Sequence, residues 1–273
     1  MAKWHRRKFG ASLFLMPLAA KAFQPIAAAA QFFAAGGRAL AQTVLPPTCL
    51  ACRKPAGASG GLCPACWQGA GFIERPYCER LGTPFSYDSG GPLISPGAFA
   101  DPPVFDRARA AMRFGDVARD LVHLLKYGDR LDLVKPFARW MTRAGDEILC
   151  EADALIPVPL HWTRLFQRRF NQSAELVRAI SRQTKLSVID DVLARVRATP
   201  PQVGLAREER AKNVHGAFSI EKTARLRVKG KRIVLVDDVL TTGATANACA
   251  RVLRRAGASR IDVLTLARVV DPV

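Results

Sequence analysis

The chain has 273 residues, of which 49% are hydrophobic and 23% charged. This composition excludes a chain too polar to bury a core, and the length accommodates one sizeable α/β domain with an appendage. The 41 Lys and Arg residues, 30 of them Arg, exceed the 23 Asp and Glu by 18. Because guanidinium groups match phosphate oxygens, the excess favours a polyanionic partner, with a merely basic soluble surface as the alternative.

Residues 1–45 are predicted to be an Ala-rich extension. The basic start and the apolar residues 12–20 resemble a secretory signal. However, Pro17 interrupts the apolar stretch and Lys21 ends it, far short of the roughly 20 residues that span a bilayer. A helix is expected over residues 26–35. We expect a cytoplasmic protein without stable membrane insertion; a signal peptide and contact with a membrane surface are the alternatives.

Five of the seven cysteines lie between residues 49 and 78. Two CxxC pairs, ten residues apart, can direct four thiolates to one tetrahedral ion, and the glycines between them allow a tight turn. We therefore predict a double zinc ribbon-like module with four cysteine ligands over residues 46–81. Disulfides are the alternative, although nothing else indicates an oxidising compartment. The predicted zinc ligands are Cys49, Cys52, Cys63 and Cys66, while Cys78 is either a replacement ligand or a leftover thiol.

Residues 82–104 are rich in Gly, Pro and Ser, a composition typical of a linker. From residue 105 to 273, helical and strand patterns alternate. Val117, Leu121 and Leu125 show helical spacing ahead of a glycine. Further helices are expected at 131–144, 170–184 and 245–256, and strands at 152–160, 232–238 and 260–270. The alternation predicts an α/β fold, a mostly parallel sheet flanked by helices, without an evident internal repeat.

The stretch "IVLVDDVLTTGAT" places Asp237 and Asp238 directly after four apolar residues. Open α/β sheets bind ligands at this end of their strands. The loop that follows offers amides, hydroxyls and a helix N-terminus, which together suit an anion. Carboxylates would repel a bare phosphate but can accept hydrogen bonds from the 2- and 3-hydroxyls of a ribose 5-phosphate. A plain strand that ends in solvated acids is the alternative, and a Walker-type loop is excluded because the sequence lacks GxxxxGK[ST].

The motif "IVLVDDVLTTGAT" is similar to the ribose-phosphate signature of type I phosphoribosyltransferases. The paired CxxC units, "LKYGDR", "PVPL", "RRFNQS" and "TPPQVGLAREERAKNVHGAF" accompany it in the order seen in the ComF family. This family comprises bacterial proteins with a zinc finger and a phosphoribosyltransferase-like domain, linked to DNA uptake in natural transformation. The resemblance extends from about residue 46 to 271. Leu81 stands where the family often has a further cysteine, and Arg169 where it usually has glycine.

The resemblance implies a type I phosphoribosyltransferase-like fold and a substrate, 5-phosphoribosyl 1-pyrophosphate (PRPP), bound with Mg²⁺. Asp237 and Asp238 would bind the ribose hydroxyls. The implied 5-phosphate loop is Thr241, Thr242, Gly243, Ala244 and Thr245. The implied pyrophosphate loop is Pro157, Val158, Pro159 and Leu160, with Arg164, Arg168 and Asn171 as polar helpers.

Residues 198–217 resemble the mobile loop that closes over the ligand in such proteins. Its expected polar contacts are Gln202, Arg210 and Asn213, and Arg210 joins Asp237 and Asp238 as a catalytic candidate. A plain surface loop is the alternative.

Two functions follow from this interpretation. In the first, the protein transfers the phosphoribosyl group to a nitrogen acceptor, chiefly by positioning and by stabilising charge on an oxocarbenium-like ring. In the second, it is a non-catalytic PRPP-binding accessory factor that handles single-stranded DNA, which the Arg-rich segments 164–182 and 207–232 favour.

Overall fold

The computed structural model describes residues 47–57, 60–88, 90–199 and 207–270. The N-terminal extension and its expected helix at 26–35 lie outside these residues. Among the helices that are described, none has the length and apolar character needed to cross a bilayer.

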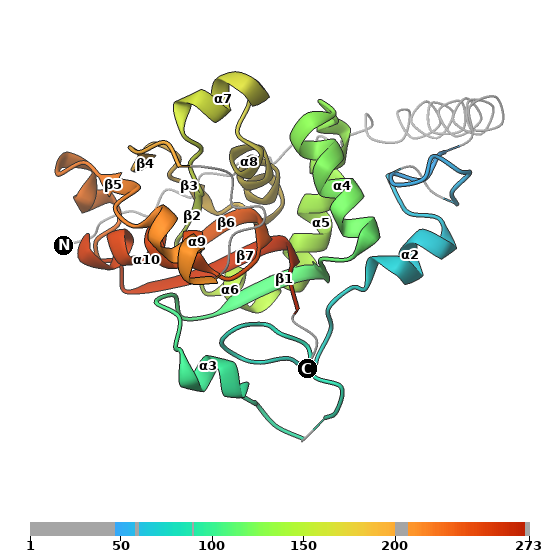
Figure 1. Ribbon diagram of the computed structural model, residues 1–273, viewed down its shortest axis with the longest axis horizontal. Helices are drawn as coiled ribbons and strands as arrows, with labels where there is room; N and C mark the ends of the chain where they lie inside the picture. Colours follow the sequence, from blue (N-terminus) through green and yellow to red (C-terminus); the bar gives the residue numbers. More distant parts are fainter. Residues whose placement is uncertain (1–46, 58–59, 89, 200–206, 271–273) are drawn as a thin grey trace, which may run out of the picture. The chain divides into compact units, whose positions relative to one another are not determined.

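A five-stranded parallel sheet forms the centre of the described chain (Figure 1). Its strand order is β1-β7-β6-β2-β3, and every neighbouring pair is parallel. The strands are β1 (Ala108–Arg113), β2 (Ala154–Pro157), β3 (Ser187–Val188), β6 (Arg232–Leu240) and β7 (Arg260–Arg268). A separate antiparallel pair joins β4 (Leu193–Arg195) to β5 (Phe218–Ile220). The predicted parallel sheet is therefore confirmed.

Helices cover both faces of this sheet, so its central strand is apolar on both sides. On β6, Ile233 and Leu235 pack into one core cluster, whereas Val234 and Val236 pack into the other. The first cluster contains the buried face of α10 (Ala244–Arg255). The second contains those of α4 (Asp116–Tyr127), α5 (Val134–Ala144) and α8 (Gln172–Thr184).

The helix predictions agree with the structure to within a few residues. The segment predicted at 131–144 starts as the 3-10 helix η1 (Leu131–Leu133) and continues as α5. The remaining short helices are α2 (Pro64–Ala70), α3 (Pro96–Ala100), α6 (Asp146–Cys150), α7 (Trp162–Arg168), α9 (Arg207–Val214) and η2 (Thr223–Arg227).

Strand β1 was not predicted, because its sequence, ARAAMR, is rich in alanine and has no β-branched residue. Five of its six residues are buried. The segment after α2 runs along the outer side of β1: the Ile73 amide donates to the Ala111 carbonyl over 2.9 Å, and the Ala108 amide donates to the Arg80 carbonyl over 2.8 Å. The edge of the sheet is thereby covered.

Candidate functional site

The two consecutive aspartates lie near the carboxyl end of β6. Asp237 stands opposite Thr265 of β7, and β6 continues to Leu240, two residues beyond the predicted end. Asp238 is 7% exposed and Asp237 is half-buried. The acids therefore sit within the last part of the ladder, at the sheet edge where open α/β folds bind ligands.

Two helix ends bring polar side chains to these acids. Lys126, at the end of α4, places Nζ 3.0 Å from Oδ1 of Asp238. Ser173, in the first turn of α8, donates its hydroxyl to Oδ1 of Asp237 over 3.0 Å, and the Asp238 amide donates to the same oxygen over 2.9 Å. Sequence reasoning missed Lys126 and Ser173, although both occur in the motifs "LKYGDR" and "RRFNQS", where their polar character was the available signal.

The electrostatics of the acid pair are unbalanced. Burial, followed by the neighbouring Asp238 carboxylate, raises the pKa of Asp237 to about 7, while Lys126 and the hydrogen bonds oppose this change. The pair therefore holds a proton over part of the neutral range. A ligand that donates hydroxyl hydrogens or brings a divalent cation would stabilise the fully ionised pair.

The loop after β6 offers hydrogen-bonding capacity to a ligand. Gly243 has φ +80°, a left-handed conformation that favours glycine, and it is the N-cap residue of α10. It has no side chain with which to cap the first-turn amides of that helix. The Thr242 hydroxyl is buried without a hydrogen-bond partner among the described residues. An anion at this position would satisfy both groups.

The segment Pro157–Leu160 leaves the sheet beside β6. Pro157 stands opposite Val236, and the Val158 amide donates to the Val236 carbonyl over 2.9 Å. Asn171 holds this segment: its Nδ2 donates to the Val158 carbonyl over 3.1 Å, while its Oδ1 accepts from the Ser173 amide over 3.0 Å and caps α8. The side chain of Asn171 thus positions the loop and Ser173 together, and its expected contact with the ligand stays a prediction.

Three arginines that lie close enough to repel one another, Arg164, Arg168 and Arg195, have no carboxylate within ion-pair distance among the described residues. Arg168 stacks over the Tyr127 ring, 5.1 Å from its centroid, and donates to its hydroxyl over 3.2 Å. Arg164 donates to the Thr199 carbonyl over 2.9 Å, and burial, followed by Arg168, lowers its pKa.

Arg195 of β4 is the third, and sequence reasoning missed it. Burial, followed by Arg164, lowers the pKa of Arg195, whereas Asp237 acts to raise it. Its Nε is buried without a partner among the residues that the structure describes. A bound anion would relieve the repulsion within this arginine group.

The predicted mobile loop differs in part from the structure. Residues 207–214 form α9, because REERAKNV lacks Gly and Pro and has acids in its first turn. Arg210 and Asn213 are half-buried on this helix, which packs against α10. Arg197 donates to the Asn213 carbonyl over 2.9 Å. Gln202 lies outside the described residues.

The four predicted zinc ligands come together at the other end of the described chain. The Sγ atoms of Cys49, Cys52, Cys63 and Cys66 all lie within 4.8 Å of one another, which suits one tetrahedral ion with Zn–S bonds of about 2.3 Å. Cys78 is fully buried outside this cluster. The donor set therefore fits a structural zinc ion.

Comparisons with known proteins agree with this architecture. The double zinc ribbon domain family matches residues 40–95, and the phosphoribosyl transferase domain family matches residues 171–271. A zinc ribbon joined to a phosphoribosyltransferase-type domain defines the class of protein.

Among the sequence relatives, DNA utilization protein YhgH of Escherichia coli O6:H1 is 30% identical over 235 residues, covering 83% of this chain and 99% of that protein. Competence protein F of Haemophilus influenzae is 28% identical over 216 residues, covering 77% of this chain and 92% of that protein. The chain belongs to the family of these proteins, the ComF family.

Solved structures with related folds are more distant. The allosteric regulatory enzyme of purine biosynthesis matches with 22% identity and a TM-score of 0.35, over 52% of this chain and 29% of that chain. Orotate phosphoribosyltransferase from Aeropyrum pernix matches with 17% identity and a TM-score of 0.31, over 55% of this chain and 77% of that chain.

Proposed function

We propose that the chain binds PRPP at the carboxyl edge of its sheet and transfers the phosphoribosyl group to a nitrogen acceptor. The observation that carries the proposal is the position of an unbalanced acid pair directly before an uncapped helix N-terminus, with a buried Thr242 hydroxyl that has no partner among the described residues. Few ligands need both hydroxyl acceptors and an anion cradle, and a ribose 5-phosphate needs both.

Each part of the ligand has candidate partners in this proposal. Asp237 and Asp238 accept hydrogen bonds from the ribose hydroxyls, and the loop 241–245 with the start of α10 binds the 5-phosphate. The segment 157–160 and the guanidinium groups of Arg164, Arg168 and Arg195 receive the pyrophosphate. Arg210 of α9 is proposed as a catalytic contact, and Asn213 and Gln202 as further polar contacts.

Transfer requires the C1–oxygen bond to pyrophosphate to break while positive charge develops on the ribose ring. The carboxylates near the ring stabilise that charge, and the arginines stabilise the departing pyrophosphate. Magnesium bound to the pyrophosphate would neutralise part of its charge. In this proposal the chain supplies position and electrostatics and needs no covalent intermediate.

Calorimetric titration with PRPP and Mg²⁺ tests binding. We expect Asp237→Asn combined with Asp238→Asn to weaken PRPP binding at least 100-fold, because both hydroxyl acceptors are lost. Asp153→Asn, at the opposite edge of the sheet, is the matched control and should bind like the wild type. Unchanged affinity in the double variant would remove the site assignment. Pyrophosphate release on addition of ammonium chloride tests transfer separately.

A second candidate function is single-stranded DNA binding, and the surface of α7 favours it. Trp162 is 71% exposed and Phe166 is 87% exposed on this helix, immediately after the proposed pyrophosphate loop. Arg168 and Arg169 follow them, and Arg168 has no acidic partner among the described residues. Bases stack on exposed aromatic rings while arginines contact the phosphates.

A salt titration of oligo(dT) binding, followed by fluorescence anisotropy, tests this second function. We expect log K to fall linearly with log salt. Combined Trp162→Ala and Phe166→Ala should weaken binding at least tenfold, since stacking contributes about 1–3 kcal/mol per base. Phe99→Ala, which removes an equally exposed ring (82%) on α3, is the control. Equal losses in both variants, or no binding at low salt, would reject the α7 surface.

A further inference from the structure

The first metal-binding turn of the ribbon has a defined backbone pattern around Cys49. The Cys49 amide donates to the Lys54 carbonyl over 2.7 Å, and the Arg53 amide donates to the Cys49 carbonyl over 3.1 Å. Arg53 has φ +64°. Thr48 and Pro55 form an antiparallel bridge across the turn.

The same pattern recurs 29 residues later around Cys78. The Cys78 amide donates to the Thr83 carbonyl over 2.8 Å, and the Gly82 amide donates to the Cys78 carbonyl over 2.7 Å. Gly82 also has φ +64°, and Tyr77 and Pro84 form the corresponding antiparallel bridge. Each bond and bridge of the first turn thus has a counterpart in the second.

The helices that complete each half also correspond. Cys63 precedes α2 and Ser95 precedes α3, each in an extended conformation with proline at the start of the helix. The Trp67 amide donates to the Cys63 carbonyl over 2.8 Å, and the Phe99 amide donates to the Ser95 carbonyl over 3.1 Å. These pairs are 32 residues apart, so the loop of the second half is three residues longer.

The sulfur atoms of the two turns are held in the same way. The amides of Cys52 and Cys63 hydrogen-bond to the Cys49 sulfur. The amides of Leu81 and Ser95, at the corresponding positions, donate to the Cys78 sulfur over 3.4 and 3.2 Å.

The correspondence identifies the second ligand set. The ligand positions of the first half are occupied in the second half by Cys78, Leu81, Ser95 and Ala98. A leucine and an alanine offer no donor atom, and zinc in structural sites requires four ligands. Cys78 and Ala98 are fully buried, and Leu81 packs against a hydrophobic core cluster.

We propose that residues 76–100 are the second half of the double zinc ribbon and that this half folds without metal, so that the chain binds one zinc ion rather than two. The ribbon would then extend beyond residue 81, into residues 82–104, whose composition predicts a linker.

In this proposal, contacts with strand β1 stabilise the second half in place of a zinc ion. Arg109, 2% exposed, donates to the Glu79 carbonyl over 2.9 Å and to its carboxylate over 2.8 Å. Gly82 approaches the Ala108 carbonyl so closely that a Cβ would lie 2.4 Å from its oxygen. The second half is thereby fixed to the sheet by hydrogen bonds, an ion pair and close backbone packing.

Zinc content of the purified full chain, measured by atomic emission, tests the proposal. We expect one equivalent in the wild type, an unchanged value in Cys78→Ala, and loss of zinc in Cys52→Ala. The combined changes Leu81→Cys, Ser95→Cys and Ala98→Cys should raise the content to two equivalents. Two equivalents in the wild type, or loss of zinc in Cys78→Ala, would overturn it. If the triple variant fails to fold, these two measurements still decide.

Discussion

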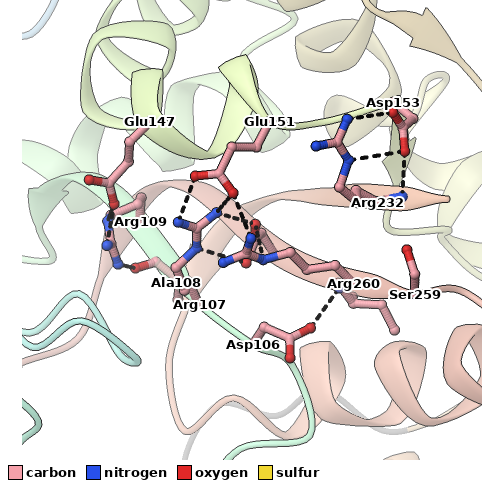
Figure 2. A network of polar contacts seen from close by, with 12 residues as sticks. Asp106, Arg107, Ala108, Arg109, Glu147, Glu151, Asp153, Arg232, Ser259 and Arg260 are labelled. Atoms are coloured by element: carbon pink, nitrogen blue, oxygen red, sulfur yellow. Dashed lines mark hydrogen bonds and ion pairs between the residues drawn. The ribbon is translucent and has the colours of Figure 1, made fainter.

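The strands of the parallel sheet have charged residues at both ends: the amino edge, where the strands begin, and the carboxyl edge, where they end. The two differ in how far positive and negative side chains are paired. At the amino edge, every labelled arginine meets a carboxylate (Figure 2). Arg107 donates to both Glu151 and Asp262, and Arg260 also reaches Glu151. Asp262, although 3% exposed, is therefore neutralised.

At the carboxyl edge the same kinds of residue are left unbalanced. Two adjacent aspartates share one lysine. Burial, followed by Arg164, lowers the pKa of Arg195, and burial, followed by Arg168, lowers the pKa of Arg164, while neither arginine has an acid at ion-pair distance among the described residues. Ion-paired side chains stabilise the fold, whereas ionisable groups without an opposite charge nearby have perturbed pKa values and are common at ligand-binding sites. The contrast separates the structural edge of this sheet from the proposed binding edge.

The largest expected effect comes from the most buried arginine of the amino edge. Arg109 and Arg75 stack on the Tyr77 ring, 4.5 and 4.7 Å from its centroid, and share the same two glutamates. Arg109 is 2% exposed and Arg75 57% exposed. We expect Arg109→Met to lower the free energy of unfolding by about 3–5 kcal/mol, because it removes several charge-assisted hydrogen bonds of a buried guanidinium, each worth about 1.5–3 kcal/mol.

Arg75→Met is the matched control for that measurement. Solvent screens its guanidinium, so urea unfolding should show a loss of at most about 1 kcal/mol. Equal losses of unfolding free energy in the two variants would show that the burial of an arginine does not determine how much its ion pairs stabilise the fold.

The next effect distinguishes the edges by the sign of their pH dependence. The pKa of Asp237 is raised to about 7 by burial and by Asp238, so its stabilising contribution is present below its unfolded pKa, near 3.8, and is lost as the pH rises to about 7. Relative to Asp237→Asn, the wild type should lose up to about 1.4 kcal/mol of unfolding free energy per pH unit between pH 5 and 7.

Asp153 behaves in the opposite way. Hydrogen bonds from Arg232 lower its pKa to about 2, so its contribution is present above pH 3.8 and is lost only as the pH falls towards 2. Between pH 5 and 7 the difference between the wild type and Asp153→Asn should stay constant in urea unfolding. If the difference in unfolding free energy between the wild type and Asp237→Asn also stayed constant from pH 5 to 7, the proposed electrostatic contrast between the two edges would be wrong.

The smallest effect is expected at the exposed end of the amino edge. Arg232 and Asp153 are 49% and 38% exposed, and such pairs are screened by salt. Arg232→Gln should leave the urea midpoint at neutral pH unchanged within error, whereas Arg107→Gln, whose side chain is 17% exposed and faces buried Asp262, should lower it. A clearly lower urea midpoint in Arg232→Gln would show that the exposed Arg232–Asp153 pair also stabilises the fold.

Much of the fold could be predicted because its signals are local. The apolar run before Asp237, the helical spacing from Val117 to Leu125 and the two CxxC pairs each specify an element or a site within a short window. Strand β1 was missed because alanines adopt the strand only where the sheet and the ribbon cover them. Helix α9 was missed because the resemblance to phosphoribosyltransferases assigned residues 198–217 to a mobile loop.

The sequence by itself determined the class of fold, the acid pair with its following loop, and the four thiolates of one zinc site. Each of these follows from a pattern of adjacent or regularly spaced residues. Only the tertiary structure decided that Lys126, Ser173 and Arg195 belong to the acid pair, because they come from three elements that converge at one sheet edge. It also related Cys78 to Cys49, since their turns share the same backbone hydrogen bonds although the residues around them differ.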